Sequence, residues 1–453
     1  MFKYGEKRIR KVGLLGLGKS NLGVYSYLSR HFPTLSFTVR ADKLSDGVPE
    51  WAERLLIGDR AFSDIDEDIL FLSPSVRRDC PVLTDAVARE VMLSSDAEFF
   101  FQHNESDVYA VTGSDGKSTT VYLTSRLLLG GYRSALPLGN FGEAMTPHLD
   151  DAPGYATVAE LSSFQLNYLK PKSVRCAITN LTPNHLNWHK SFSEYAGAKA
   201  NILPGAKETV LNYDCPESRK LFAKTRPYAV ISRRLSLRAL VREVSAEIYV
   251  YEREGRIYIN GEPMLDTKKI RAFSDYNVSN FACAMALAYG KYDKELLYGI
   301  AEGFGGLPHR CELVGEKDGV RYYDSSIDSS PKRCAATLSR FSGNVILILG
   351  GRSKGLDFSE LVPPLLRVAR KIIITGECAD EIEAALLRDT DFLRSGIKYL
   401  KIQDFFDAVG AATDSAVSGD AVLLSPAATS FDRFKSFEER GDAFKSFLKT
   451  KGI

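Results

Sequence analysis

The segment from Thr112 to Thr120 has the composition of a phosphate-binding loop. It holds two glycines, a lysine and several hydroxyl residues, between an apolar strand at 108–111 and a helical stretch at 121–129. In such a unit, glycines let backbone N–H groups approach phosphate oxygens, and the helix start adds positive potential. The lysine adds a point charge, and a hydroxyl after it ligates magnesium. The segment therefore predicts a nucleotide site made by Gly113, Ser114, Asp115, Gly116, Lys117, Ser118 and Thr119.

The loop departs from the usual phosphate-loop spacing at its start. That spacing would place a glycine at position 111, where Val111 stands, and the first glycine is Gly113. A glycine-rich turn without a ligand is the alternative interpretation. Lys117 and the two hydroxyl residues that follow it favour nucleotide binding.

Two polar side chains follow neighbouring predicted strands. Glu160 comes directly after the apolar run 156–159, and His185 follows the run 176–178. Because the carboxyl ends of parallel strands gather around one crevice, both side chains should lie beside the phosphate loop. Mg²⁺ prefers oxygen ligands and usually keeps waters and substrate phosphates. Glu160 and His185 are therefore candidate magnesium ligands.

A second glycine-containing turn, from Gly16 to Asn21, joins an apolar strand at 12–15 to a helix. The dinucleotide-binding fingerprint would have a third glycine at position 21, so Asn21 argues against an NAD-dependent oxidoreductase. Two interpretations stay open: a tight turn of purely structural use, or a site for another nucleotide diphosphate. In the second, Lys19 and Ser20 contact the substrate.

Short apolar runs alternate with helical patterns along the chain, which indicates parallel α/β structure. The alternation breaks at 246–259, where alternating residues and a turn at Glu254 predict a β-hairpin. It resumes with runs at 345–349, 372–374 and 421–424. We therefore predict three α/β domains: a Rossmann-like domain at 1–98, a central phosphate-loop domain with a small antiparallel element at 99–306, and a Rossmann-like domain at 307–453.

The composition is that of an ordinary globular protein. With 453 residues, more than one core is expected. The 59 basic and 57 acidic residues give a net charge of +2, which provides no general field for nucleic acid. No tract is long enough to predict membrane insertion. Seven scattered cysteines without metal-ligand spacing favour a reducing cytoplasm.

Taken together, these segments resemble the Mur ligase family over essentially the full chain. The loop at 112–120 resembles the variant phosphate loop of Mur ligases and folylpolyglutamate synthases, including its missing early glycine. The segment 160–166 resembles the family members that add D-glutamate. The resemblance implies an ATP-dependent, monomeric ligase that joins UDP-N-acetylmuramoyl-L-alanine to D-glutamate through an acyl phosphate, in peptidoglycan precursor synthesis. The three domains would bind the UDP substrate, ATP and the amino acid, in that order.

The resemblance also implies roles for individual residues. Lys117, His185 and Lys199 would be catalytic, with two Mg²⁺ ions held by Ser118, Glu160, His185 and a carbamylated Lys199. Carbamylation would turn an ammonium group into an anionic oxygen ligand. The remaining implied contacts are Asn140, Ser162 and Gln165 on the muramoyl substrate, Asn277, Asn280, His309, Arg310 and Asp324 on ATP, and Lys354, Ser430 and Phe437 on D-glutamate.

The chain departs from the family pattern at five positions. Tyr276 replaces a histidine before Asn277, Ser326 replaces a lysine after Asp324, and Asn187 stands where aspartate is commoner. Ser75 replaces a glycine, and Arg40 falls near an acidic position that ends the second strand. A sibling ligase for another amino acid, a folylpolyglutamate synthase and a catalytically silent nucleotide-binding paralogue are the rival interpretations.

Overall fold

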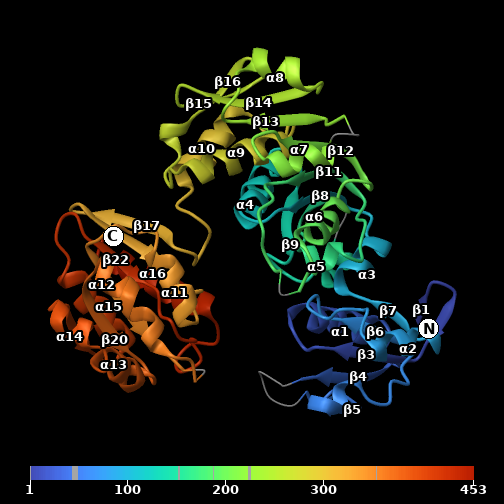
Figure 1. Cartoon of the computed structure of the whole chain (residues 1–453), viewed down its shortest axis with the longest axis horizontal. Helices are drawn as coiled ribbons and strands as arrows, with labels where there is room; N and C mark the ends of the chain where they lie inside the picture. The colour runs from blue at the N-terminus through green and yellow to red at the C-terminus, as the bar shows by residue number, and fades with distance from the viewer. Residues whose placement is uncertain (1, 43–48, 152–153, 187, 223–225, 354) are drawn as a thin grey trace. The chain divides into compact units, whose positions relative to one another are not determined.

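The computed structural model describes residues 2–42, 49–151, 154–186, 188–222, 226–353 and 355–453 (Figure 1). The chain divides into two compact units, Met1–Gly303 and Phe304–Ile453, each of which is described by itself. The first unit carries a five-stranded and a nine-stranded sheet, and the second carries a six-stranded sheet. The prediction of an α/β fold is confirmed.

The five-stranded sheet belongs to the N-terminal part of the first unit. Its order is β5-β4-β3-β6-β7, and every neighbouring pair is parallel. The strands are β3 (Lys11–Leu15), β4 (Ser36–Ala41), β5 (Arg54–Ile57), β6 (Ile69–Leu72) and β7 (Met92–Ser94); the helices are α1 (Lys19–His31), α2 (Pro81–Ala88) and α3 (Asp96–His103). A short hairpin of β1 (Phe2–Tyr4) and β2 (Lys7–Ile9) precedes them. The apolar strand predicted at 12–15 is the buried part of β3, and its neighbour β6 is buried along its whole length.

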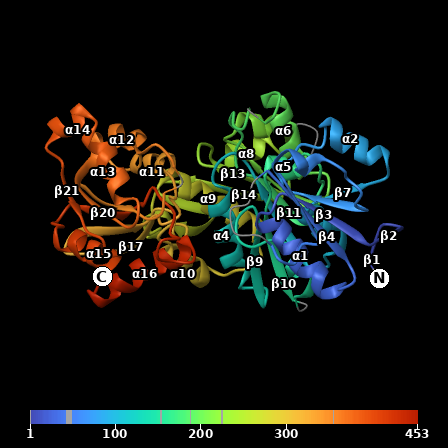
Figure 2. The same cartoon turned by 90° about the horizontal axis from the view of Figure 1, so that it is seen from below.

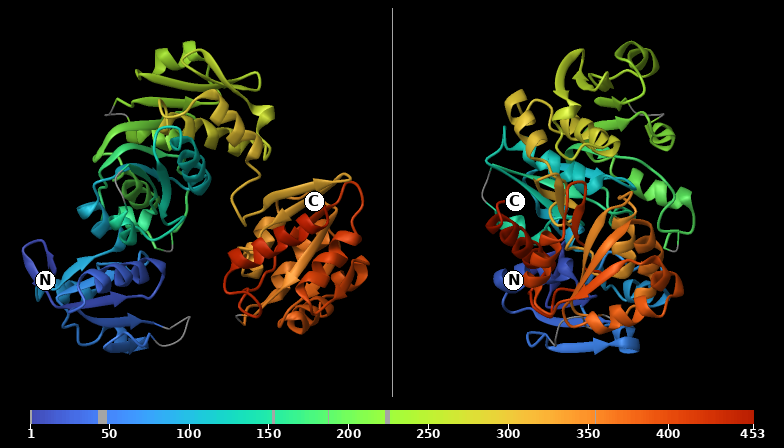
Figure 3. Two further views of the ribbon diagram at one scale, coloured as in Figure 1. Left: turned by 180° about the vertical axis from the view of Figure 1, so that it is seen from behind. Right: turned by 90° about the vertical axis from the view of Figure 1, so that its left-hand side faces the viewer.

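The nine-stranded sheet forms the centre of the first unit, in the order β16-β15-β14-β13-β12-β11-β8-β10-β9. Its parallel strands are β8 (Asp107–Thr112), β9 (Ser134–Gly139), β10 (Tyr155–Glu160), β11 (Ser173–Ile178), β12 (Ala206–Asn212), β13 (Ala229–Ser232) and β14 (Ile248–Arg253). Strands β15 (Arg256–Ile259) and β16 (Glu262–Asp266) continue the sheet antiparallel, as Figure 3 shows in yellow-green. The predicted hairpin at 246–259 is confirmed by the pairing of β14 with β15.

Helices cover the central sheet on both faces. One apolar core joins the strands to α5 (Ser163–Leu166), α6 (Phe192–Ala200), α7 (Pro216–Phe222) and α8 (Leu237–Glu243). Helix α4 (Lys117–Leu128) packs against α9 (Asp275–Leu287) and α10 (Lys294–Gly303). Because α4 begins directly after the loop that follows β8, its first turn faces the carboxyl edge of the sheet.

The second unit is a six-stranded sheet in the order β17-β18-β22-β19-β20-β21. Its strands are β17 (Glu312–Lys317), β18 (Val320–Asp324), β19 (Val345–Gly350), β20 (Ala369–Thr375), β21 (Lys398–Lys401) and β22 (Ala421–Leu424), parallel except for β17. Helices α11 (Pro331–Leu338), α12 (Val362–Val368) and α13 (Ala379–Leu387) cover one face, and α15 (Phe405–Asp414) and α16 (Phe437–Thr450) cover the other (Figure 2). A short helix, α14 (Thr390–Ser395), lies between α13 and β21.

Residues of β19 alternate between these two cores. Val345, Leu347 and Leu349 pack on the first face, whereas Ile346 and Ile348 pack on the second. A strand buried on both faces reads as a continuous apolar run, which explains why the sequence signal here was clear. Among the described residues, none of the helices is long and apolar enough to cross a lipid bilayer.

Candidate functional site

The predicted phosphate loop joins β8 to α4 and is held by hydrogen bonds to the segments packed beneath it in the central domain. Gly113 has φ of 150° and Gly116 has φ of 78°, backbone conformations that favour glycine. The Ser114 hydroxyl is turned inward, 2.8 Å from the Tyr195 hydroxyl and 3.0 Å from the carbonyl of Thr182. This serine therefore supports the loop through its side chain, and only its backbone is available to phosphate.

The charged end of the loop lies in the first turn of α4. Lys117, Ser118 and Thr119 follow the left-handed Gly116 and are half-buried. The Lys117 ammonium donates to the carbonyl oxygen of Ser114 at 2.8 Å, so its side chain folds back over the loop. Asp115 is exposed, and its backbone N–H donates to the Asn180 side chain at 2.9 Å.

Glu160 ends β10 directly beside the loop. Its strand pairs with β8 on one side and β9 on the other, with Glu160 opposite Val111 and Gly139. The carboxylate is 1% exposed and accepts a hydrogen bond from Asn140 Nδ2 to Oε1 at 2.6 Å. Its second oxygen, Oε2, is buried without a partner among the described residues. A buried carboxylate oxygen without a donor is costly, and a divalent cation would satisfy it.

Lys199 projects from α6 toward the same edge and is 2% exposed. Its ammonium donates to Thr112 Oγ1 at 3.1 Å and lies 4.9 Å from the centre of the Tyr195 ring. Burial and, to a smaller extent, the nearby Lys117 charge lower the pKa of Lys199 to about 7, against the opposite influence of Glu160 and Asp115. A large part of its amine is therefore neutral near pH 7.

His185 lies in a turn after β11. Its φ is 54°, which is uncommon for a residue with a side chain, and its carbonyl accepts from the N–H groups of Trp188 and His189 at 3.0 Å each. The ring packs edge-on to Phe164, with ring centres 5.0 Å apart. Burial lowers the pKa of His185, and the Lys199 and Lys117 charges lower it further, which favours the neutral imidazole that metals bind.

Helix α9 brings the two predicted asparagines to the loop. Asn280 Oδ1 accepts from Thr120 Oγ1 at 3.5 Å, and a Cβ atom on Gly116 would lie only 2.4 Å from the same oxygen. Asn277 is tied by its Nδ2 to the carbonyl of Ala272 at 2.7 Å, and its Oδ1 accepts from Asn280 at 3.4 Å. Gly116 is therefore required by the close approach of α9 as well as by its own conformation.

Ser162 and Gln165, predicted as substrate contacts, form a capping box at the start of α5. The Ser162 hydroxyl accepts from the Gln165 N–H at 3.3 Å, and Gln165 Oε1 accepts from the Ser162 N–H at 2.9 Å. This reciprocal pair is a local helix-start device. It fixes the turn that follows Glu160, and the spacing of serine and glutamine signals it in the sequence.

The N-terminal turn supports two distinct contacts. Asn21 is fully buried and donates to the carbonyls of Leu15, Gly16 and Phe71 at 2.7–3.2 Å, which holds the tight turn in place. Lys19 instead reaches the central domain, where its ammonium donates to the carbonyls of Gly139 and Gly142 at 2.9 and 2.6 Å. Ser20 follows it in the first turn of α1.

Arg40 is a structural residue in this fold. It is 0% exposed, and its guanidinium pairs with both carboxylate oxygens of Glu67 at 2.9 and 3.0 Å. The remaining N–H groups donate to the carbonyls of Ala61, Ser63 and Asp64. Since all five guanidinium donors are used, Arg40 has none left for a uridine contact.

In the second unit, His309, Asp324 and Phe437 lie together. His309 Nδ1 is 2.7 Å from Asp324 Oδ2, and both residues are buried. The Phe437 ring, at the start of α16, lies edge-on to His309 with centres 6.1 Å apart. Arg310 is the next residue along the chain and is exposed. The structure thus brings a predicted D-glutamate contact next to predicted ATP contacts.

Ser430 is placed by a two-residue bridge. Arg352 and Thr429 exchange backbone hydrogen bonds at 2.9 and 3.0 Å, which brings the loop after β19 against the loop after β22. Ser430 is 2% exposed beside this bridge. Lys354, predicted in the same pocket, lies outside the described residues, as does Asn187.

Arg440, which belongs to none of the predicted motifs, organises this second-unit site. Its guanidinium is buried and donates to the hydroxyl and carbonyl of Ser326 at 3.0 Å and to the carbonyl of Ala428 at 3.0 Å. Burial lowers the pKa of Arg440 to about 10, against the influence of Asp432 and Asp324. A buried guanidinium therefore lies against Ser326, the residue that replaces a lysine of the family pattern. An arginine three residues after Phe437 on one helix is the available sequence signal.

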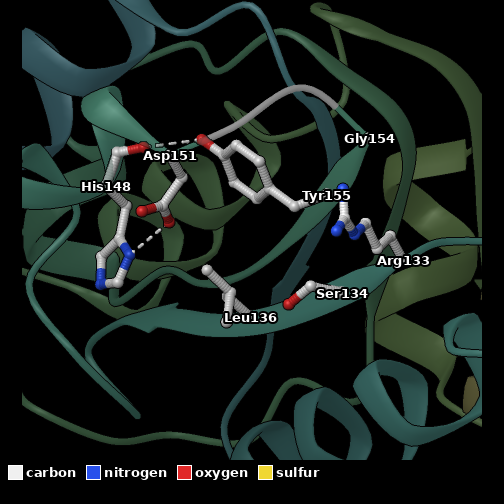
Figure 4. Close-up of a pocket in the computed structure, with 7 residues that line it drawn as sticks. All are labelled: Arg133, Ser134, Leu136, His148, Asp151, Gly154 and Tyr155. Carbon is white, nitrogen blue, oxygen red and sulfur yellow. Dashed lines mark hydrogen bonds and ion pairs between the residues drawn. The ribbon is translucent and has the colours of Figure 1, made fainter.

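A separate cavity of about 460 Å³ lies at the opposite edge of the central sheet (Figure 4). It is lined by the starts of β9 and β10, including Ser134 and Tyr155, with His148 held by Asp151 at 2.7 Å. The Tyr155 hydroxyl donates to the His148 carbonyl at 2.8 Å. Ligands of open α/β sheets bind outside the carboxyl ends of the strands. None of the predicted site residues lines this cavity.

Comparisons with known proteins agree with this architecture. A family model described as Mur ligase middle domain matches residues 111–288, and one described as Mur ligase, glutamate ligase domain, matches residues 309–428. The solved UDP-N-acetylmuramate-alanine ligase MurC of Thermotoga maritima aligns with 98% of this chain and all of its own, at 16% identity and a TM-score of 0.55. That likeness shows the shared fold.

Sequence relatives extend over nearly the whole chain, which belongs to the Mur ligase family. A relative from Ruminiclostridium cellulolyticum is 35% identical and covers 97% of this chain and 96% of its own. A second, from Acetivibrio thermocellus, is 33% identical and covers 98% of both chains. Each of these two relatives is named UDP-N-acetylmuramoylalanine--D-glutamate ligase.

Proposed function

We propose that this chain is an ATP-dependent ligase that joins D-glutamate to UDP-N-acetylmuramoyl-L-alanine in peptidoglycan precursor synthesis. One structural observation carries the proposal: the phosphate loop, Glu160 and Lys199 converge at the carboxyl edge of one parallel sheet. Relatives named as D-glutamate ligases are 33–35% identical over nearly the full length of the chain, which supports D-glutamate as the amino acid that is added. We assign the UDP substrate to residues 1–98, ATP to 99–306 and D-glutamate to 307–453.

The residues at this edge fit magnesium. The buried Glu160 Oε2 has no hydrogen-bond partner among the described residues. An anionic oxygen of this kind is a suitable ligand for Mg²⁺. We assign Ser118, Glu160, His185 and Lys199 as the residues that would hold two ions. When bound, Mg²⁺ would neutralise charge on the transferring phosphoryl group.

Lys199 is suited to carbamylation. Reaction with CO₂ needs a neutral amine, and the depressed pKa of Lys199 supplies one near pH 7. The product is an anion, and the neighbouring Lys117 charge and a cation would both stabilise it. We propose that the modified Lys199 side chain ligates one of the two ions.

The reaction requires two steps. The substrate carboxylate attacks the γ-phosphorus of ATP and releases ADP, which leaves an acyl phosphate. The D-glutamate amine then attacks the carbonyl carbon, loses a proton and expels phosphate, giving an amide. Lys117 and the loop amides bind the phosphates, Asn277 and Asn280 support the loop and contact ATP, and Asn140 orients Glu160.

Residues of the second unit are also assigned to the substrates. We assign His309, Arg310 and Asp324 to ATP, and Ser430 and Phe437 to D-glutamate together with Lys354. A lysine with hydroxyl and backbone donors suits a dicarboxylate. The free thiols of all seven cysteines support a cytoplasmic location, and we propose that the enzyme acts as a monomer.

The test is phosphate release by the purified protein with Mg-ATP and UDP-N-acetylmuramoyl-L-alanine. We expect release to depend on D-glutamate and to fail with L-glutamate, L-alanine or L-lysine. Lys117→Ala should abolish it, whereas Lys207→Ala, at an exposed lysine of β12, should not. The product should be heavier by one glutamyl unit.

Other outcomes would redirect the proposal. Release that depends on another amine would make the chain a sibling ligase. ATP binding without release would favour a silent paralogue, an alternative that the loss of the family lysine at Ser326 raises. Retained activity in Lys117→Ala would refute the assigned phosphate site.

A further inference from the structure

A pair of arginines links the N-terminal sheet to the central domain. Arg77 and Arg78 lie in the loop after β6, which also packs against the N-terminal turn: a Cβ atom on Gly16 would lie 2.3 Å from Ser73 Oγ. The two arginines reach different parts of the central domain. This difference separates a residue that only joins the domains from one that also acts on the site.

Arg77 contacts the turn that carries His185. Its guanidinium donates to the carbonyl of Trp188 and stacks over the Trp188 ring at 4.7 Å. The indole Nε1 of Trp188 in turn donates to the carbonyl of Ser75 at 2.8 Å. The Trp188 N–H donates to the His185 carbonyl at 3.0 Å. Because Arg77 holds Trp188, it also restrains the backbone of His185.

Arg77 also contacts the helix that carries Lys199. Both of its terminal nitrogens lie 3.5 Å from Glu194 Oε1. Glu194 is in the first turn of α6, where its other oxygen accepts from the Lys190 N–H at 2.7 Å. One side chain of the N-terminal domain therefore touches two of the segments that supply proposed metal ligands.

An aromatic cluster connects Trp188 to the His185 ring. The Trp188 ring lies 4.7 Å from Phe164 and 4.6 Å from His189, and Phe164 packs on His185 at 5.0 Å. His189 is 1% exposed and pairs with Ser163 Oγ at 2.9 Å. Rings packed this closely move together, so displacement of Trp188 would shift the His185 ring.

We propose that Arg77 is a positioning residue for magnesium: by holding Trp188 and Glu194, it sets the His185 turn and α6 in the arrangement that binds the ion. This inference rests on the proposed function for the identity of the metal ligands. It adds a route by which the N-terminal, substrate-binding domain acts on the metal end of the site.

Arg78 provides the matched control. It stacks on Tyr168 at 4.5 Å, its N–H donates to the Tyr168 hydroxyl at 3.0 Å, and its guanidinium pairs with Glu98. Arg78 thus joins the same loop to the central domain without contacting Trp188 or Glu194. Loss of either arginine removes a domain contact, but only loss of Arg77 should disturb the metal site.

The experiment measures Mg²⁺ binding directly. The chain has two tryptophans, so in a Trp51→Phe background Trp188 emission reports on the turn. We expect Arg77→Ala to raise the half-saturating Mg²⁺ concentration about 10- to 100-fold, in the fluorescence titration with ADP and in the activity assay. Arg77→Lys should recover part of this loss, because it keeps the charge near Glu194 without the flat stack on the indole. The KM for ATP at saturating Mg²⁺ should stay within about twofold.

Two results would overturn the proposal: an unchanged Mg²⁺ midpoint in Arg77→Ala, or an equal shift in Arg78→Ala, which would reduce Arg77 to a domain contact. If Arg77→Ala does not fold, the Arg77→Lys midpoint decides in the same way. The fluorescence titration uses no muramoyl substrate or amino acid. It therefore stands even if the chain proves to ligate another amine, which separates failure of this inference from failure of the proposed function.

Discussion

Gly441 is the position where a single added methyl group should break the His309–Asp324 pair of the second unit. This glycine is buried in α16, and a Cβ atom there would lie 2.1 Å from His309 Nδ1 and 2.5 Å from Asp324 Oδ2. Since carbon contacts are normally about 3.5–4.0 Å, one or both groups must move by roughly 1 Å. Gly441→Ala therefore separates a buried pair that is now 2.7 Å apart.

The expected cost follows from three terms. Loss of a hydrogen bond to a charged group costs about 1.5–3 kcal/mol, and overpacking costs about 1–3 kcal/mol. The higher helix propensity of alanine offsets about 1 kcal/mol. The net destabilisation should be about 1.5–5 kcal/mol, which corresponds to amide exchange in α16 and β18 faster by about ten- to several-thousand-fold.

Hydrogen exchange and ATP kinetics together test this reasoning. Displacement of His309 by about 1 Å should lower kcat/KM for ATP about 100-fold. Gly410→Ala is the control within the same unit, because its Cβ would lie 3.6 Å from Phe447, an ordinary contact. We expect this variant to exchange no faster than the parent protein. Native exchange and unchanged ATP kinetics in Gly441→Ala would refute the argument.

Two further predictions concern buried charges. Glu67→Ala leaves the Arg40 guanidinium buried and partly unpaired, which should destabilise the N-terminal domain by about 3–5 kcal/mol in urea unfolding followed by Trp51 emission. Asp85→Ala, which breaks an exposed ion pair, should change the stability of the domain by less than about 0.5 kcal/mol. Equal destabilisation by the two substitutions would contradict the reasoning. For Lys199, the neutral amine predominates above its pKa of about 7 and is lost as the pH falls through it. With ¹³C-labelled bicarbonate, a carbamate resonance should be present at about pH 8, fade toward about pH 6 and be missing in Lys199→Arg; a signal that grew only above about pH 10 would fit an ordinary lysine instead.

The carboxyl edge of the central sheet was readable from the sequence for a simple geometric reason. Parallel strands place their ends along one line, so a run such as 156–159 followed by Glu160 fixes the side of the sheet on which the carboxylate lies. Adjacency of β10 to β8 then brings Glu160 to the loop. The local pattern could not show that Glu160 Oε2 lacks a partner, because that depends on every group packed around it.

Long-range pairing set the limit of the sequence analysis. Arg40 falls near an acidic position of the family pattern, and its sequence neighbours do not show that Glu67, 27 residues away, takes two of its donors. Arg77 and Trp188 are 111 residues apart, and no periodicity links them. Arg440 reaches Ser326 over 114 residues. Contacts of this kind are set by how the sheets and helices pack, which short motifs do not encode.

Comparison of Arg40 with Glu160 separates a charge that serves the fold from one that serves a ligand. Both are almost fully buried, and both lie within the last two residues of a strand whose neighbours are parallel. Burial of a charge is tolerated when its hydrogen bonds are complete, and all five Arg40 donors are occupied. Glu160 keeps one oxygen without a partner among the described residues, beside the lysines of the loop and of α6. A folded chain that leaves such an oxygen unsatisfied carries a cost that a bound cation would remove, which is why we propose Glu160, and not the equally buried Arg40, as a ligand-binding residue.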